Sequence, residues 1–116
     1  MIGRLEIVMV VVSDMERSVA FYRDTLGLQV VEQSPYWSEL DAGTIHVGLH
    51  PSEGGEVPHG EGVTLLFYVD DAEQTVGQLR ERGAEIAMEP KRQEWQGVLA
   101  AVKDPDGHLI QLLQNA

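Results

Sequence analysis

The chain has no cysteine, which excludes disulfide frameworks, thiol catalysis and thiolate metal sites. It also has no apolar run near the roughly 20 residues that span a bilayer, and its first residues lack the long apolar stretch of a signal peptide. Basic residues are scarce: 8 Lys and Arg stand against 19 Asp and Glu, for a formal net charge of −11. Such a chain repels phosphate backbones and anionic lipid surfaces. We therefore expect a cytoplasmic protein with no nucleic-acid partner and no membrane partner.

One pattern occurs twice in the 116 residues. An apolar segment (7–12) leads to Asp14, and another (63–69) leads to Asp71. Superimposing these two aspartates also aligns Ser13 with Asp70, Glu16 with Glu73, Val19 with Val76, Tyr22 with Leu79 and Arg23 with Arg80. After a one-residue gap, Gly27 falls on Gly83. Chance similarity would explain part of this match, but the shared caps and glycine favour an internal duplication.

Each copy predicts one helix followed by three strands. Ser13-x-x-Glu16 and Asp70-x-x-Glu73 are typical of capping boxes, and Gly27 and Gly83 suit left-handed helix ends. The expected strands after the helices are 28–33, 36–40 and 44–50, then 85–88, 98–103 and 108–113. The fold is therefore α+β, with two tandem βαβββ modules. Modules 1–50 and 62–116, joined by a Gly- and Pro-rich linker at 51–61, form a single domain over residues 1–116.

A four-stranded sheet with one helix leaves one face uncovered. Two such sheets are expected to pair around a shared cleft, which is the natural place for a ligand. Strand alternation and the two tryptophans predict the residues that face or rim this cleft. The candidate ligand-binding residues are Trp37, Glu39, His46, Thr64, Leu66, Tyr68, Trp95 and Gln111.

Each polar or aromatic candidate has a structural alternative. A tryptophan can pack in a core or a dimer interface, and His46 can be an ordinary hydrogen-bonded strand residue. Glu39 is either a general base or one of many surface carboxylates, while Asp14 and Asp71 are explained by the helix starts. We expect His50 and His59 to be solvated and His108 to be structural. No catalytic triad, P-loop or dinucleotide motif identifies a catalytic residue.

Two segments carry a family resemblance. The first helix with its flanks, VSDMERSVAFYRDTLGL (12–28), and the ending DPDGHLIQL (104–112) resemble the vicinal oxygen chelate superfamily. That superfamily includes glyoxalase I, extradiol dioxygenases, methylmalonyl-CoA epimerase, fosfomycin-modifying enzymes and bleomycin resistance proteins. The resemblance implies the fold for nearly the whole chain, but it leaves the reaction open because one scaffold hosts several chemistries.

The resemblance also implies where a metal ion would bind. Enzymes of the superfamily use one His, Gln or Glu ligand on each of four strands, and the corresponding slots read Ile7, His46, Thr64 and Gln111. His46 is placed by matching residues 45–47 to 110–112. One imidazole and one amide do not hold a catalytic metal tightly, since such sites want about three good ligands. We therefore expect no metal and no other cofactor.

Two functions remain. The first is metal-free binding of a planar or aromatic small molecule, resembling sequestration by bleomycin resistance proteins; the acidic charge favours a cationic guest. The second is a glyoxalase- or epimerase-like lyase or isomerase with a divergent metal site. The resemblance also implies a homodimer, and a half-covered sheet gives a physical motive for one.

Overall fold

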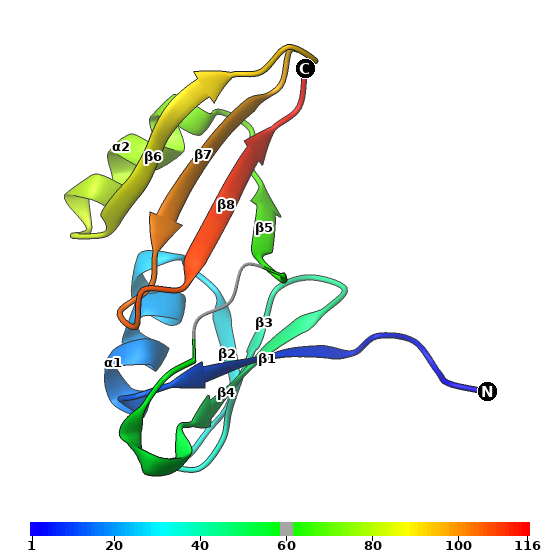
Figure 1. The fold of residues 1–116 in the computed structure, drawn as a ribbon, viewed down its shortest axis with the longest axis vertical. Coiled ribbons are helices and arrows are strands. Elements are labelled where there is room, and N and C mark those ends of the chain that lie inside the picture. The colour runs from blue at the N-terminus through cyan, green and yellow to red at the C-terminus, as the bar shows by residue number, and fades with distance from the viewer. Residues whose placement is uncertain (59–61) are drawn as a thin grey trace. The chain divides into compact units, whose positions relative to one another are not determined.

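This computed structural model describes residues 1–58 and 62–116. Within them the chain forms two four-stranded sheets, each with one main helix (Figure 1). The chain divides into two compact units, Met1–Pro58 and His59–Ala116. The expectation for His59 falls outside the described residues. No helix among the residues described is long and apolar enough to cross a membrane.

The two units repeat one topology. The first contains β1 (Ile7–Val12), α1 (Met15–Ala20), the π-helix η1 (Phe21–Thr25), β2 (Gln29–Gln33), β3 (Ser38–Asp41), β4 (His46–Pro51) and the short 3-10 helix η2 (Glu53–Gly55). The second contains β5 (Leu65–Tyr68), α2 (Ala72–Glu81), β6 (Glu85–Arg92), β7 (Val98–Lys103) and β8 (Leu109–Gln114). Strand orders are β1-β4-β3-β2 and β5-β8-β7-β6, with the first pair of each sheet parallel and the others antiparallel. The predicted α+β fold with two βαβββ modules is confirmed.

Strand alternation sends one apolar set under each helix. In the first unit Val12, Leu40, Val47 and Leu49 are buried with Val19 and Tyr22 of the helical segment. In the second unit Ala100, Val102, Ile110 and Leu112 are buried with Val76 and Leu79 of α2. Each buried Leu or Val contributes about 1.5–3 kcal/mol relative to exposure, so these layers fix the register of the strands. The residues between them face the opposite, uncovered side.

The helix caps lie one residue later than the capping boxes predict. Asp14 and Asp71, rather than Ser13 and Asp70, are the N-caps, and their side chains accept hydrogen bonds from the backbone N–H groups of Arg17 and Gln74 at 3.0 Å. Both caps have extended backbones, which lets a short carboxylate reach back to the first turn. The sequence offered two adjacent capping residues in each copy, and only the second of each has this geometry.

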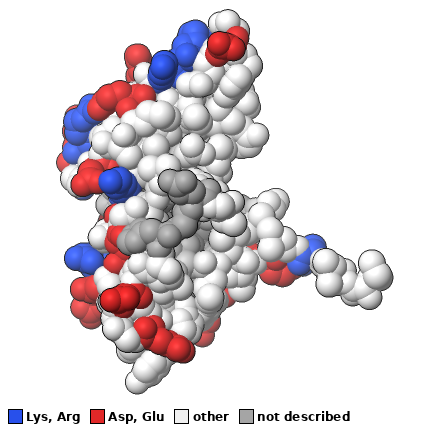
Figure 2. Space-filling model, in the orientation of Figure 1, with Lys and Arg blue, Asp and Glu red and all other residues white. Residues whose placement is uncertain are grey.

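The acidic excess does not form one continuous field on the face in view. Figure 2 shows acidic and basic side chains interspersed there, with uncharged surface between them. Several of the charges are paired on the surface, including Arg23 with Asp24 at 2.7 Å and Lys103 with Glu85 at 3.5 Å. Exposed pairs of this kind contribute little to stability.

Replacing Asp71 by alanine tests the observed cap. Asp71→Ala should lower the free energy of unfolding by about 1 kcal/mol, because the N–H of Gln74 loses its acceptor. Asp70→Ala should change it by less than about 0.5 kcal/mol. Urea denaturation measures both, and Asp71→Asn, which keeps the acceptor, is the control. A larger loss for Asp70→Ala than for Asp71→Ala would contradict this assignment.

Candidate functional site

Three of the predicted ligand-binding residues, Trp37, Glu39 and His46, lie on the uncovered face of the first sheet. Val47 and Leu49 of β4 are buried under the helix, so His46, Gly48 and His50 face the other way. Strand pairing sets His46 beside Ile7 and Asp41, and Gly48 beside Met9 and Glu39. Ile7 and Met9 are 37% and 56% exposed, so this face offers apolar surface next to ionisable side chains.

Trp37 lies on this face, directly over Gly48. A Cβ atom at Gly48 would stand 2.2 Å from Cη2 of Trp37 and 2.7 Å from its Cζ2. Gly48 is consequently buried although it points away from the helix. Ser34 fixes the turn that delivers the indole: its hydroxyl accepts from the N–H of Trp37 at 3.1 Å, and the Ser34 N–H donates to the Trp37 carbonyl at 3.0 Å.

Glu39 joins the indole to the imidazole of His46. The Nε1–H of Trp37 points to Oε1 of Glu39 at 3.4 Å, and Oε2 of Glu39 lies 2.5 Å from Nδ1 of His46. The other ring nitrogen of His46, Nε2, is 3.9 Å from Oδ1 of Asp41, beyond hydrogen-bonding distance. The Glu39 and His46 side chains are 19% and 33% exposed, so both remain accessible to a ligand.

This pairing raises the pKa of His46 above its ordinary value of 6.5. The hydrogen bond to Glu39 is the largest cause, and the negative charges of Glu39, Asp41 and Glu6 add to it, while burial opposes it. The protonated imidazole and the Glu39 carboxylate then form a charge-assisted pair. The open face therefore combines an aromatic platform, aliphatic side chains and one tightly coupled acid–base pair.

The remaining five predicted residues belong to the second unit. Leu66 and Tyr68 of β5 and Gln111 of β8 lie on the uncovered face of the second sheet, where Leu66 is opposite Gln111 and Tyr68 opposite Leu113. Trp95 lies in the turn between β6 and β7, 54% exposed, and covers Gly97, where a Cβ would come 1.8 Å from its ring atom Cζ3. Thr64 is exposed and immediately precedes β5.

The strand register refines the comparison of ligand slots. Val11 and Tyr68 each lie three residues before their N-cap, and they pair with His50 and Leu113 respectively. Gln111 is therefore the counterpart of Gly48, and His46 is the counterpart of Leu109, a shift of two residues from the match of 45–47 with 110–112. A shift of two keeps every side chain on the same face, so alternation alone does not detect it.

The donor set does not fit a tightly held metal under either alignment. With His46 in the fourth-strand slot, the set has one imidazole and one amide beside Ile7 and Thr64; with Gly48 there, the slot has no side chain and lies under Trp37. Over residues 1–58 and 62–116, no three His, Asp or Glu side chains are grouped to hold a metal ion. Isoleucine and glycine supply no ligand atom from a side chain.

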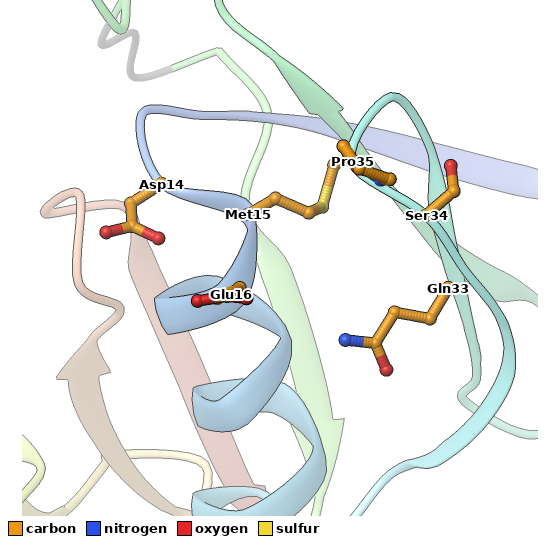
Figure 3. A pocket seen from close by; sticks show the side chains of 6 residues that line it. All are labelled: Asp14, Met15, Glu16, Gln33, Ser34 and Pro35. Atoms are coloured by element: carbon orange, nitrogen blue, oxygen red, sulfur yellow. The ribbon is translucent and has the colours of Figure 1, made fainter.

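A hollow that the sequence did not indicate lies beside α1. Its volume is about 650 Å³, and it is lined by Asp14, Met15, Glu16, Gln33, Ser34 and Pro35 (Figure 3). In this view the Met15 side chain extends from the start of α1 toward Pro35. None of the eight predicted ligand-binding residues lines it.

The one missed residue with a detectable signal is Gly48, since an isolated glycine inside a strand often marks close approach of another group.

A family model described as "Glyoxalase/Bleomycin resistance protein/Dioxygenase superfamily" matches residues 4–112. The chain belongs to this superfamily. The match covers both βαβββ modules and confirms the family resemblance of the first helix and of the C-terminal segment.

Relatives of the chain carry names from two functional classes. A bleomycin resistance protein from Klebsiella pneumoniae is 28% identical over 88% of this chain and 85% of its own length. A probable lactoylglutathione lyase from Synechocystis is 27% identical over 93% of this chain and 92% of its own. The crystal structure of TnmS3, an antibiotic binding protein from Streptomyces sp. CB03234, superposes with a TM-score of 0.82 at 28% identity, covering 99% of this chain and 98% of that one.

The Glu39–His46 pair gives a pH-dependent prediction. NMR titration of wild-type protein should find the His46 pKa above 6.5, and Glu39→Gln should lower it toward that value because the carboxylate acceptor is gone. Asp41→Asn, which alters a group 3.9 Å away, should lower it less. Since the folded-state pKa is the higher one, the pair stabilises the fold fully below pH 6.5 and loses this effect as pH rises through the folded-state pKa. A wild-type His46 that titrates at or below 6.5 would contradict this assignment.

Proposed function

We propose that the chain binds a planar or aromatic small molecule on the open face of the first sheet, without a metal ion. The observation that carries this proposal is the indole of Trp37, held over Gly48 and beside the Glu39–His46 pair. An aromatic face surrounded by aliphatic side chains with a few convergent polar groups suits an organic guest. The names of the bleomycin resistance and antibiotic binding relatives support a small-molecule ligand.

The charge of the chain supports a cationic guest. The net charge of −11 attracts cations over a distance of several ångströms at physiological salt. On the open face itself, Glu39 and Asp41 outnumber the one imidazole between them, so this group of side chains has excess negative charge even when His46 is protonated. An aromatic ring also attracts a cation through its face.

A second candidate function is acid–base catalysis of the lyase or isomerase type. The observation in its favour is the Glu39–His46 contact of 2.5 Å, because an imidazole positioned by a carboxylate can serve as a general acid or base. The name of the Synechocystis relative supports it as well. Turnover of a hemithioacetal or an acyl-CoA substrate by metal-supplemented protein, lost in Glu39→Gln, would favour the enzyme over the binding protein.

Fluorescence titration tests the binding proposal. Bleomycin and a panel of planar aromatic compounds, both cationic and neutral, should include a compound that quenches tryptophan emission and raises the melting temperature. Trp37→Phe should weaken binding of that compound by about tenfold or less, since stacking on one indole contributes on the order of 1 kcal/mol beyond burial. Trp95→Phe, measured in parallel, tests the same role for the second unit.

Tyr36→Leu is the matched control for Trp37→Phe. Tyr36 is the preceding residue in the same turn, is aromatic, and is 79% exposed. Its replacement should leave binding unchanged within error. The proposal fails if no compound in the panel causes quenching or a thermal shift.

Metal analysis tests the metal-free character separately. Protein purified without chelator should carry less than about 0.2 equivalents of Zn, Ni, Mn or Fe, because the slots supply too few ligand atoms. Elemental analysis measures the content before and after dialysis against EDTA, and the melting temperature should not change on dialysis. Near-stoichiometric metal that disappears in His46→Ala would refute this prediction.

Light scattering tests the expected homodimer. Leu5, Met9 and Val31 are 65%, 56% and 55% exposed in the first unit, as is Tyr68 at 71% in the second. Exposed apolar surface of this extent favours association with a second copy. We expect a mass of twice the 12.8 kDa of one chain at micromolar concentration. A mass of one chain under those conditions would contradict the prediction.

A further inference from the structure

Each tryptophan of the chain lies on a glycine of its own unit. Trp37 covers Gly48, and Trp95 covers Gly97, with ring atoms 2.2 Å and 1.8 Å from where a Cβ would stand. No real Cβ atom tolerates such distances, so both indoles occupy space that any other residue type would fill. Gly97 is only two residues from Trp95, whereas Gly48 lies in β4, eleven residues after Trp37.

Glycine is an unfavourable residue at position 48 unless the space that a side chain would fill is needed by another group. It lies inside β4, which has β1 on one side and β3 on the other, and it pairs with Met9 and Glu39. Glycine in a strand interior weakens the strand, because it loses more conformational entropy and has no side chain to pack. Gly48 is not among the glycines with positive φ, so its backbone conformation is open to any residue. The remaining reason for glycine is the contact with Trp37.

The same contact determines how Trp37 can meet a ligand. A methyl group at position 48 would meet the rigid six-membered ring of the indole, which has no flexible end that could move aside. The ring would have to lift off the sheet and break the long 3.4 Å contact between Nε1 and Glu39. As long as the ring stays against β4, its N–H points to Glu39.

We propose that Gly48 is the positioning residue for Trp37: by leaving the sheet bare beneath the indole, it lets the ring rest against β4 and beside Glu39, where the guest meets it. This inference deepens the proposed function and rests on it for the identity of the guest. The placement of the indole by Gly48 can be measured without any ligand, so the two claims are separable.

The first test uses Trp95→Phe protein, in which Trp37 is the sole tryptophan. Adding Gly48→Ala should change the near-ultraviolet circular dichroism of Trp37, red-shift its emission and increase its quenching by acrylamide. Gly77→Ala is the matched control, because a Cβ at Gly77 meets nothing within 4 Å, and it should leave all three signals unchanged. If Gly48→Ala behaves like Gly77→Ala, the inference is overturned.

The second test is a double-mutant cycle that remains informative if Gly48→Ala folds poorly. Gly48→Ala should lower the urea concentration at the unfolding midpoint. The decrease should be at least twice as large with Trp37 present as in a Trp37→Ala background, since the clash disappears with the indole. A double variant that folds better than Gly48→Ala supports the inference. An equal loss in both backgrounds overturns it, because the added methyl group would then clash with another neighbour such as Ile7, whose Cγ2 lies 3.0 Å from the Cβ position.

Binding of the quenching compound from the titration then separates the two claims. Gly48→Ala should weaken binding at least as much as Trp37→Phe, while Gly77→Ala should not. If Gly48→Ala displaces the indole by the spectroscopic criteria but binding is unchanged, the positioning role stands and stacking on Trp37, the basis of the proposed function, is refuted.

Discussion

Each sheet has two faces and a single helix to cover them. The pleat sends Val47 and Leu49 of β4 under the helix of the first unit, and this leaves His46, Gly48 and His50 on the uncovered side. The same division recurs in β8 of the second unit, where Ile110 and Leu112 are buried and Gln111 is not. The strand residues that we propose as ligand-binding lie on the uncovered faces, where a side chain is held by the sheet and still accessible to a ligand.

On the first sheet, that constraint brings apolar and ionic groups close together. Trp37 replaces side-chain packing over Gly48, and Glu39 satisfies both the indole N–H and the imidazole. A carboxylate so engaged is partly neutralised, which lowers the cost of bringing an apolar ring next to it. The pair and the platform therefore depend on each other, and neither is a feature of one strand alone.

The sequence predicted the fold well because duplication and alternation are both properties of local sequence. The strand positions and the faces of residues 7–12 and 46–50 result from a period of two. The caps were one residue off because Ser13 and Asp14, like Asp70 and Asp71, are all capping residue types, and the difference lies in backbone geometry. The predicted fourth-strand ligand slot was two residues off because a shift of two keeps every side chain on the same face of the sheet. The contact of Trp37 with Gly48 joins the turn before β3 to β4, and no periodicity along one strand reveals it.

The π-helix η1 accounts for a difference in length between the helical segments of the two copies. Gly27 is the thirteenth residue after the N-cap Asp14, but Gly83 is only the twelfth after Asp71, so the first copy has one extra residue before its glycine. A π-helical turn is the form in which a helix absorbs one inserted residue without shifting the strands beyond it. Phe21 and Tyr22 lie in that turn, both are buried, and their rings meet edge to face at 5.2 Å. The extra residue is thus accommodated within the helix, and the strands after Gly27 keep the topology of the other copy. Within the helical segment, the one-residue difference in length between the two copies is therefore confined to the π-helical turn.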